Sequence, residues 1–363
     1  MGFLEKQRRL QSVVLTGVGP LSRDIPKDTV IKRIGLRMQG AIQTTFASGT
    51  PVARADSIFH SLINSIQVVA NGGRFIKNVQ PHLVRMQALL NTSVQGERGS
   101  VAAAAPQLTK VQVDSGFVYG TTTQYTTLNE TLTLPFEFIW SKAESERMLT
   151  WFDTRDLSSA EIRFQQNPYS SLLSQANTAP VTFSNSTIQI DITLVEAVGV
   201  PKGQKFFDFR QTTKDIPFTG QATNYQIEIN RNNALAGLLF YAKDGAAGST
   251  STATDRLASN SLATDMTLKL NGNIDLKATT FLDLQAENRA RYGVVAPFSG
   301  SVSQLDGIAH MNFINNSISD AVNTKTGVDS LYLFVSTNSA SNVSYTNTAF
   351  LTIQTDEIAE ISQ

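Results

Sequence analysis

The feature that most constrains this chain is an internal repeat, in which one hairpin signal returns after 200 residues. The segment Ser61–Gly73 aligns without a gap with Ser261–Asn273, and this alignment places Asn71-Gly72 on Asn271-Gly272. Asn-Gly between alternating apolar and polar runs is the strongest short-range signal of a β-hairpin, because these residues tolerate the positive φ angles of its turn. The chain is therefore expected to contain one strand–turn–strand unit twice.

Further blocks recur in the same order in the two halves of the chain. The pairs are Arg23-Asp-Ile-Pro26 with Lys214-Asp-Ile-Pro217, Leu134–Ile139 with His310–Ile314, and Asp156–Phe164 with Asp329–Val335. Each half also closes with a long strand pattern, Ser186–Glu196 and Thr348–Glu357. A common order of several blocks predicts two domains of like topology. The competing explanation is that all-β chains reuse the same turn dipeptides by chance.

Strand patterns dominate the chain between the turn signals. Apolar residues alternate with polar ones in Ile31–Met38, Leu132–Phe138, Ile188–Leu194, Tyr225–Ile229 and Met266–Leu270, which are expected to be half-buried strands. Helical spacing is confined to Pro81–Asn91 and Thr280–Arg291, with a turn or two within Ser141–Phe152. The stretch Ala246–Ala253, rich in Gly, Ser and Thr, is expected to be a surface loop. The fold class is therefore all-β.

These patterns predict two domains that follow a separate N-terminal arm. We assign residues 1–22 to the arm, residues 23–200 to the first domain and residues 201–363 to the second. Each domain is long enough for the eight strands of a jelly roll, in which two antiparallel sheets pack face to face. The prediction is two tandem eight-stranded jelly rolls, because a parallel βαβ fold would need far more helix.

Composition limits the classes of function. The 363 residues carry no net formal charge at pH 7 and include no cysteine. A neutral chain is not a general polyanion binder, and no sequence-specific binding of nucleic acid is expected. The lack of cysteine excludes disulfides and thiol chemistry. No stretch approaches the roughly 20 apolar residues that span a bilayer, and the N-terminus does not resemble a secretory signal. We therefore expect a protein made in a cytoplasm.

Groupings of catalytic or metal-binding residue types are scarce. The three histidines, His60, His82 and His310, lie at no metal-ligand spacing, so no metal or other cofactor is expected. No Gly-x-Ser-x-Gly nucleophile motif occurs. Gly17 and Gly19 begin a phosphate-binding pattern, but Ser22 stands where its third glycine belongs. These two glycines are better interpreted as a flexible joint.

Carboxylates close in sequence to Trp140 and Trp151 are the remaining candidates for catalysis, because paired carboxylates beside aromatic side chains can hydrolyse glycosides. They are Glu137, Glu144, Glu146, Asp153 and Asp156. Glu137 alternates with Phe136 and Phe138 and is expected to face outward, and the others neighbour Lys142, Arg147 and Arg155. The better interpretation is that these carboxylates decorate the surface of a strand and a short helix, and the protein is not predicted to be an enzyme.

Basic residues are concentrated near the N-terminus. Residues 1–40 hold eight lysines and arginines against three acidic residues, although the whole chain is neutral. Phe3, Leu10 and Val14 give one apolar stripe at helical spacing, and Lys6, Arg8 and Arg9 lie off it. This pattern suits a short amphipathic helix that contacts a neighbouring subunit or an anionic membrane surface. The alternative is a terminus that packs on its own domain.

The repeat, carried by Arg23–Pro26 with Lys214–Pro217 and by the two Asn-Gly hairpins, resembles the double jelly-roll major capsid proteins. These occur in tailless, membrane-containing bacterial and archaeal viruses and, enlarged, as the adenovirus hexon. The resemblance implies a homotrimer that forms a pseudo-hexagonal capsomer of an icosahedral virion. It further implies contacts with neighbouring capsomers, with penton and minor capsid proteins and, through the arm, with an internal membrane. It transfers no individual site residue.

Two other classes of function are compatible with two jelly rolls. One is a receptor-binding or carbohydrate-binding spike of a virion, which predicts an exposed aromatic platform. The other is a double jelly-roll glycoside hydrolase, which needs two carboxylates in one cleft.

Overall fold

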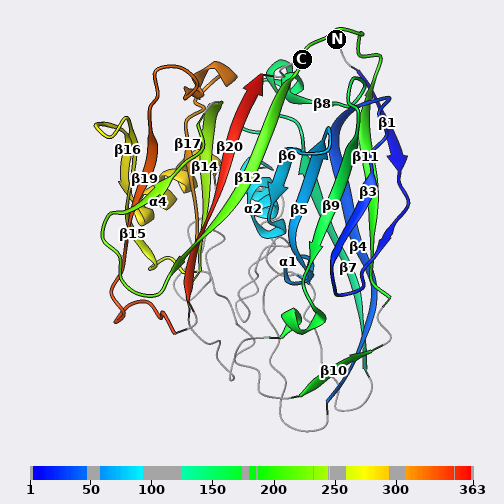
Figure 1. Ribbon diagram of the computed structural model, residues 1–363, viewed down its shortest axis with the longest axis horizontal. Helices are drawn as coiled ribbons and strands as arrows, with labels where there is room; N and C mark the ends of the chain where they lie inside the picture. The colour runs from blue at the N-terminus through cyan, green and yellow to red at the C-terminus, as the bar shows by residue number, and fades with distance from the viewer. Residues whose placement is uncertain are drawn as a thin grey trace.

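The computed structural model describes residues 3–46, 58–92, 124–173, 180–184, 187–231, 233–243, 245, 259–293, 307–346 and 348–360. They form two upright β-sandwiches that stand side by side, one from each half of the chain (Figure 1). Each sandwich has its own apolar core. The expectation of an all-β chain with few helices is confirmed, and the loop expected at Ala246–Ala253 lies outside the described residues.

The first sandwich consists of two sheets. One has the order β7–β4–β11–β1, with β2 continuing β1 along β11, and the other has the order β3–β9–β5–β6. Two short strands, β8 and β10, pair with β4. The bounds are β1 Leu4–Arg9, β2 Val13–Val14, β3 Pro20–Asp24, β4 Val30–Phe46, β5 Ile63–Ala70, β6 Arg74–Val79, β7 Gln124–Pro135, β8 Phe152–Asp153, β9 Ala160–Gln166, β10 Val181–Ser184 and β11 Gln189–Val198.

The second sandwich repeats this arrangement. One sheet has the order β17–β14–β20–β12, with the short β18 also on β14, and the other has the order β13–β19–β15–β16. The bounds are β12 Phe207–Phe218, β13 Tyr225–Glu228, β14 Ala234–Lys243, β15 Ala263–Leu270, β16 Ile274–Thr280, β17 Ile308–Asn312, β18 Val322–Asn323, β19 Leu331–Thr337 and β20 Ala349–Glu360.

The strand order identifies both sandwiches as jelly rolls. When β1 and β2 are counted as one interrupted strand, and β8, β10 and β18 are set aside, each half has eight strands. In each half the sixth, third, eighth and first strands form one sheet, and the second, seventh, fourth and fifth form the other. This order is that of two packed Greek keys. The prediction of two tandem eight-stranded jelly rolls is confirmed.

Helices occupy corresponding places in the two jelly rolls. The α-helices are α1 Ile58–Leu62, α2 Pro81–Thr92, α3 Glu144–Arg147 and α4 Phe281–Tyr292, and the 3-10 helices are η1 Met148–Thr150, η2 Tyr169–Leu172 and η3 Ile318–Asp320. The two long helices, α2 and α4, follow the fifth strand of their jelly rolls and begin 200 residues apart. Both were expected from their spacing, as was the turn of helix within Ser141–Phe152.

The two predicted hairpins are confirmed as equivalent turns. Asn71 and Asn271 have φ angles of 51° and 49°, and the glycine after each also has a positive φ. The Asn71 amide donates to the carbonyl of Ser159, and the Asn271 amide donates to the carbonyl of Ser330, each at 2.9 Å. Ser159 and Ser330 both precede the seventh strand of their jelly rolls. The gapless repeat is therefore a repeat of structure.

The other repeated blocks divide into real and accidental matches. Leu134–Ile139 and His310–Ile314 both belong to the end of the sixth strand, and the blocks that begin at Asp156 and Asp329 both lead into the seventh. The match of Arg23–Pro26 with Lys214–Pro217 is wrong. Asp24 ends β3, the second strand of its jelly roll, whereas Lys214–Pro217 lies inside β12, the first strand of the second jelly roll.

The predicted N-terminal helix is also wrong, because residues 4–9 form a strand that pairs antiparallel with β11 along its whole length. After a break at Leu10–Ser12, β2 continues the pairing. Val13 enters the core of the first jelly roll and Leu10 packs against it. The backbone groups along the edge of β11 outweigh a local helical pattern, which is a weak determinant of structure. The first jelly roll thus begins at Leu4, before the expected boundary at residue 23.

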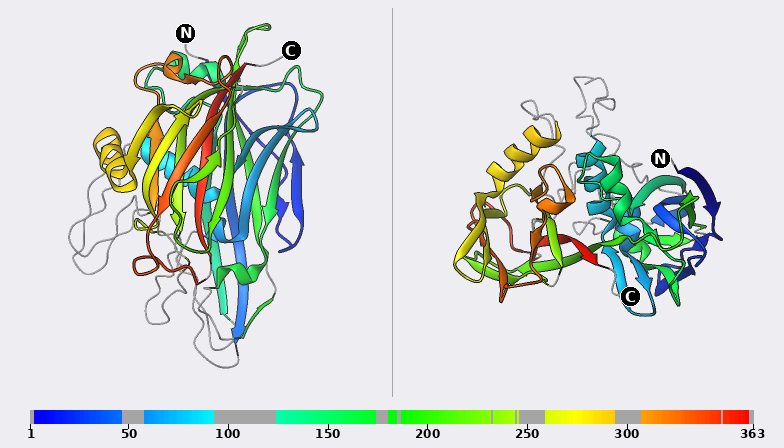
Figure 2. Two further views of the ribbon diagram at one scale, coloured as in Figure 1. Left: turned by 60° about the vertical axis from the view of Figure 1, so that its left-hand side comes forward. Right: turned by 90° about the horizontal axis from the view of Figure 1, so that it is seen from above.

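The two jelly rolls join through one continuous sheet. β6 of the first pairs parallel with β12 of the second at Gln211↔Lys77 and Thr212↔Asn78. The sheet β3–β9–β5–β6 therefore continues into β12–β20–β14–β17. Seen from above, α2 lies where the two jelly rolls meet, and α4 lies along the same side of the molecule, on the second jelly roll (Figure 2). We call the contact between the two jelly rolls the seam.

Candidate assembly surfaces

The seam has an apolar core distinct from the cores of the two jelly rolls. Leu83, Met86 and Leu90 of α2 are buried in it against Leu239 and Tyr241 of β14. The remaining buried members are Phe138, Ile139, Trp140, Phe209, Ala236, Ile308, Ile314 and Ile358. On β14, alternate residues therefore serve two cores, because Leu238 and Phe240 point into the second jelly roll. Burial on both faces makes this sheet and α2 one rigid unit.

A buried polar network crosses the seam and centres on Asp356 of β20. Its carboxylate accepts hydrogen bonds from Trp140 Nε1 at 2.6 Å and from Gln211 Nε2 and Gln354 Nε2 at 2.9 Å each. Gln211 Nε2 also donates to Gln87 Oε1 of α2 at 3.0 Å, and Lys77 Nζ donates to Gln211 Oε1 at 2.7 Å. Gln87 Nε2 and Gln354 Oε1 have no hydrogen-bond partner, but the bonds that are made link both jelly rolls and fix the relative position of the elements that they join.

Lys77 brings a charge into this network. Its side chain is fully buried, with Nζ 3.9 Å from the centre of the Phe209 ring. Burial lowers the pKa of Lys77 well below its usual value and raises the pKa of Asp356. Removal of either partner would leave a buried charge or its hydrogen-bonding groups without compensation, so both residues hold the two jelly rolls together.

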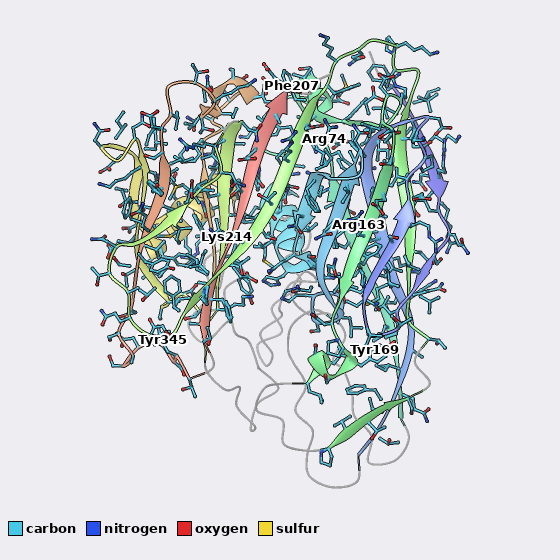
Figure 3. All side chains as sticks on the ribbon, viewed as in Figure 1. Arg74, Arg163, Tyr169, Phe207, Lys214 and Tyr345 are labelled. Atoms are coloured by element: carbon cyan, nitrogen blue, oxygen red, sulfur yellow. The ribbon has the colours of Figure 1, made fainter. Side chains whose placement is uncertain are left out.

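Ion pairs extend the seam beyond this buried network. Arg74 of β6 lies 3.5 Å from the carboxylate of Asp208 on β12, near the upper end of the seam in Figure 3. Asp208 is nearly fully buried and also lies 3.4 Å from Arg210. Charges at a nearly buried site are weakly screened, so this group also opposes separation of the jelly rolls.

Three of the five carboxylates singled out in the sequence form ion pairs or hydrogen bonds, whereas Glu144 and Asp156 are exposed. Glu146 accepts hydrogen bonds from Ser141 and, across the seam, from Ser317 Oγ at 2.6 Å and the Ile318 amide at 3.0 Å. These hydrogen bonds help to keep the pKa of Glu146 below its usual value, against the effect of desolvation. Glu137 pairs with Arg147, and Asp153 pairs with Arg155. Glu137, which was expected to face outward, is only 13% exposed, as is Asp153, which lies in β8 and not on the short helix.

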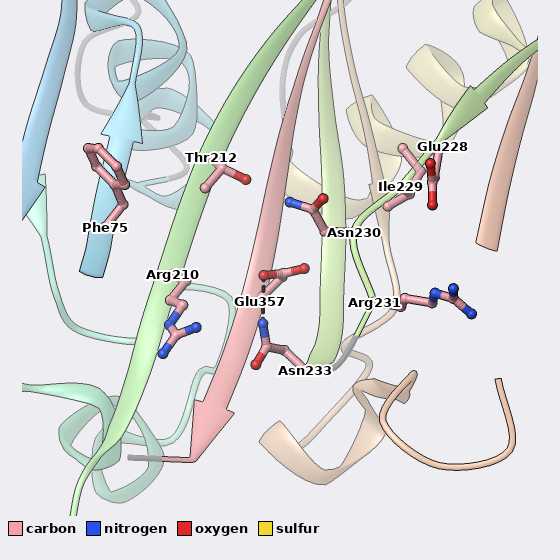
Figure 4. Close-up of a pocket in the computed structure, with 9 residues that line it drawn as sticks. All are labelled: Phe75, Arg210, Thr212, Glu228, Ile229, Asn230, Arg231, Asn233 and Glu357. Carbon is pink, nitrogen blue, oxygen red and sulfur yellow. Dashed lines mark hydrogen bonds between the residues drawn. The ribbon is translucent and has the colours of Figure 1, made fainter. Parts of the chain in front are cut away.

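A grouping that the sequence did not suggest lies on the solvent side of the seam. Figure 4 shows an open hollow of about 450 Å³ with Glu228 of β13 and Glu357 of β20 among its lining residues. Burial raises the pKa of Glu357, whose carboxylate accepts a hydrogen bond from Asn233 at 2.9 Å. Arg210 and Arg231 line the same hollow. Its residues come from strands far apart in the chain, so no sequence spacing could have indicated it.

Two of the three histidines lie side by side, with the ring centroids of His60 and His82 5.3 Å apart. His310 is buried among Trp140, Tyr292 and Asn288, and the Tyr292 hydroxyl lies 2.7 Å from its Nδ1. Burial lowers the pKa of His310 to about 3. Its ring therefore acts as a neutral packing group. No cluster of three His, Asp or Glu ligands occurs in the part of the chain that the structure describes.

The residues predicted to form an N-terminal contact surface are divided by the strand. Phe3 packs edge-on against Trp151, and Arg8 pairs with Asp28 and Glu196. Arg9, which is 66% exposed, pairs with the buried Asp191. Lys6 and Val14 are exposed, and Leu10 is half-buried. The six residues therefore do not share one face. Among the described helices, none has the length and apolar character that a bilayer crossing requires.

Among the described residues, two flanks at opposite ends of the molecule are not covered by another element. One is the outer face of the sheet β7–β4–β11–β1, at the right in Figure 1, and the other carries α4 and β16, at the left. We call them the sheet flank and the helix flank. Each corresponds to a surface that is buried in the seam, because α2 and β6 there meet the sheet β17–β14–β20–β12. The chain thus presents the two halves of a second seam on opposite sides.

This architecture, two like jelly rolls joined edge to edge, is the double jelly-roll fold of viral major capsid proteins. Similar solved structures include that of Sulfolobus turreted icosahedral virus, with a TM-score of 0.65, 14% identity and coverage of 98% of this chain and 91% of that chain. The major capsid protein of bacteriophage PM2 has a TM-score of 0.54, 12% identity and 99% coverage of both chains. The capsid of the virus PBCV-1 gives a TM-score of 0.58 and 10% identity, with 99% of this chain and 94% of that chain covered. No family model and no curated protein sequence matches the chain.

Proposed function

We propose that this protein is the major coat protein of an icosahedral virion and that it has no enzymatic activity. The observation that carries this proposal is the pair of complementary flanks. On the helix flank, α4 and β16 of the second jelly roll correspond to α2 and β6, which the first jelly roll places in the seam. On the sheet flank, the sheet β7–β4–β11–β1 corresponds to β17–β14–β20–β12, which the second jelly roll places in the seam. A surface pair of this kind joins copies head to tail, and such contacts close into rings when the rotation allows.

A ring of three copies is the form of closure that we propose. Three chains bring six jelly rolls of like topology, which gives a nearly six-fold tile for a closed shell. The interfaces should be of the obligate size, roughly 2,000 Å² or more, because each flank exposes most of one sheet or one helix with its adjoining strand. Contacts of this tile with neighbouring capsomers, penton and minor capsid proteins belong to the same proposal.

The N-terminal residues are proposed to contact a neighbouring copy. Arg9 lies on the sheet flank, and Leu4 and Lys6 are exposed on the edge strand β1. Binding to an internal membrane surface, the second role expected for this segment, would need several free cations. Arg8 is engaged with Asp28 and Glu196 instead and is 26% exposed, which favours a contact with a neighbour through Arg9, whose side chain is 66% exposed.

Two observations favour a coat protein over the other functions considered. A carbohydrate-binding spike needs an aromatic platform, and the exposed large aromatic side chains of the described residues are Phe75 and Tyr225, one in each jelly roll. A glycoside hydrolase needs two carboxylates that flank a bound sugar. Glu228 and Glu357 share one open hollow, where the Glu357 carboxylate is bonded to Asn233, and Asp153 and Asp156 share another, where Asp153 pairs with Arg155.

Sedimentation of the full recombinant chain tests this proposal. At micromolar concentration we expect a single species with three times the mass of the chain, which assembles into closed shells when crowded. A stable monomer, or hydrolysis of polysaccharide by the purified chain, would contradict the proposal.

A further inference from the structure

The internal repeat makes α2 and α4 comparable residue by residue. Both helices are 12 residues long, and the offset of 200 that aligns the hairpins also aligns the helices. Val84 and Leu284, which correspond, each pack into the core of their own jelly roll. The helices are therefore oriented alike on their sandwiches, and corresponding positions face corresponding surroundings.

The faces that point away from the two sandwiches differ in chemistry. On α2 this face carries Leu83, Met86, Gln87 and Leu90, all buried in the seam. The corresponding residues of α4 are Asp283, Ala286, Glu287 and Ala290, and all four are exposed. The positions that form an apolar contact within the chain thus carry acidic and small residues on the helix flank.

The strand beside each helix repeats the contrast. Lys77 of β6 and Lys277 of β16 correspond, as do Gln87 and Glu287. In the seam, Lys77 and Gln87 both bind Gln211 of the next sheet. On the helix flank, Lys277 Nζ donates to Glu287 at 2.6 Å, and their side chains are 32% and 45% exposed. Lys277 and Glu287 therefore form their hydrogen bond with each other, in place of hydrogen bonds to a neighbouring sheet.

The sheet flank carries the complementary charge. Arg9 and Arg37 are exposed on its outer face, and Arg33 is 39% exposed. Asp191 lies in register with Arg37, but it is buried and its carboxylate accepts hydrogen bonds from Arg9, Ser12, Gln39 and Gln189. Glu5 lies close to Lys32 and Arg33. On the sheet flank, the basic side chains are thus more accessible than most of the carboxylates. On the helix flank, the acidic side chains of α4 are accessible.

We propose that the α4 face of Asp283, Ala286, Glu287 and Ala290 binds the sheet flank of a second copy of this chain, next to Arg9 and Arg37. The junction between chains is polar where its counterpart within the chain is apolar. This inference rests on the proposed function and specifies the chemistry of the contact between subunits. An apolar seam forms once, as the chain folds, whereas a junction with acidic and small residues at these four positions exposes less apolar surface on the free chain, with Leu282 and Ile274 as the exposed large apolar residues of α4 and β16. Charged complementary surfaces also direct association and fix register.

Charge reversal on each side of the junction tests this inference. We compare the wild type with Asp283→Lys plus Glu287→Lys, with Arg9→Glu plus Arg37→Glu, and with a chain that carries all four changes. A ring of three cannot alternate two kinds of chain, so the compensating changes must be in one chain. Each double variant should weaken trimer formation about 100-fold or more, because like charges then face each other. The quadruple variant should regain most of the lost affinity.

A matched control carries the same change of charge away from both flanks. Asp24→Lys plus Glu161→Lys alters a pair in register on β3 and β9, and its trimers should form as in the wild type. Circular dichroism of the dilute monomers checks that every variant is folded. Raising the salt concentration from about 0.05 M to about 0.5 M should weaken wild-type trimers, since exposed charges are then screened.

The outcomes separate this inference from the proposed function. If the wild type forms trimers but the double variants form them equally well, or if trimers become tighter with salt as an apolar contact would, the polar junction is wrong and the coat function stands. If the wild type forms no trimer, the proposed function itself fails.

Discussion

Single residues at repeated positions show how the two jelly rolls have diverged. Lys77 is buried in the seam beside Asp356, whereas Lys277 forms a half-exposed pair with Glu287. The hairpin positions remain alike, because a positive φ leaves little choice of residue. Positions that define the fold are therefore kept, and positions that define an interface differ between the contact within the chain and the free flank.

The Asp356 carboxylate is expected to be the most costly side chain to remove from the seam. In Asp356→Ala, Trp140, Gln211 and Gln354 lose an acceptor and Lys77 loses its countercharge. We expect a loss of about 3–5 kcal/mol in the free energy of unfolding, measured by urea denaturation. Glu360→Ala is the control, because this carboxylate of the same strand pairs with Lys325 while 72% exposed. The urea midpoint of Glu360→Ala should equal that of the wild type. Equal effects of the two substitutions would refute the structural role of the network.

His310 makes the stability of the second jelly roll depend on pH. Burial lowers its pKa to about 3 in the folded chain, so the unfolded chain binds the additional proton between pH 6.5 and about 3. Stability from this group is complete above its usual pKa and falls as the pH decreases, by about 1.4 kcal/mol per unit. His310→Gln should be less stable at neutral pH but show a flatter decline on acidification, measured by urea midpoints. Parallel pH profiles of the variant and the wild type would contradict this assignment.

At the scale of elements, the hairpins and helices were predictable and the N-terminus was not. Asn-Gly turns and 12-residue amphipathic helices are specified by adjacent residues, so β5–β6, β15–β16, α2 and α4 follow from the sequence. The pattern of residues 3–14 fits a helix as well as a strand, and residues 4–9 form a strand because they pair with the edge of β11. Pairing between residues that lie nearly 190 positions apart leaves no local signal. For the same reason, neither the parallel pairing of β6 with β12 nor the hollow beside Glu357 could be predicted.

The two Asn-Gly turns should respond alike to substitution. Asn71→Ala and Asn271→Ala place an alanine at a φ near 50°, which Asn tolerates better. Asn71→Ala also removes a hydrogen bond with Ser158, and Asn271→Ala removes hydrogen bonds with Asp329 and Ser330. Each should cost about 1–3 kcal/mol in thermal or urea unfolding. Asn→Gly at the same positions keeps the turn accessible and should cost less. A neutral Asn271→Ala beside a destabilising Asn71→Ala would argue against equivalent turns.

Removal of the N-terminal strand should damage the first jelly roll. A chain without residues 2–9 loses β1, one of the strands that pair with β11, and the ion pairs of Arg8 and Arg9. The exposed edge of β11 then favours aggregation. We expect low solubility and rapid proteolysis within the first jelly roll. A detachable arm, as the sequence suggested, would instead leave the trimers intact. Soluble trimers of the shortened chain, with wild-type resistance to protease, would restore that interpretation.

At the scale of the whole molecule, the proposed assembly uses one junction twice. Inside the chain it joins the jelly rolls through an apolar core, a buried network and a continuous sheet. Between chains, the corresponding helix and sheet surfaces are exposed, with acidic residues on one and arginines on the other. The two jelly rolls of one chain are covalently linked, so their seam forms within the chain as it folds. Separate subunits, in contrast, must remain soluble until they assemble. The difference in chemistry follows from that difference in timing.

Electron cryomicroscopy of the purified full chain at micromolar concentration tests the central claim most directly. The account predicts three-fold particles in which six jelly rolls form a ring, with α4 of each chain against the outer face of β4 and β11 of the next. The seam within a chain and the junction between chains should then superpose. Monomers, two-fold dimers, or rings in which α4 faces solvent would contradict it.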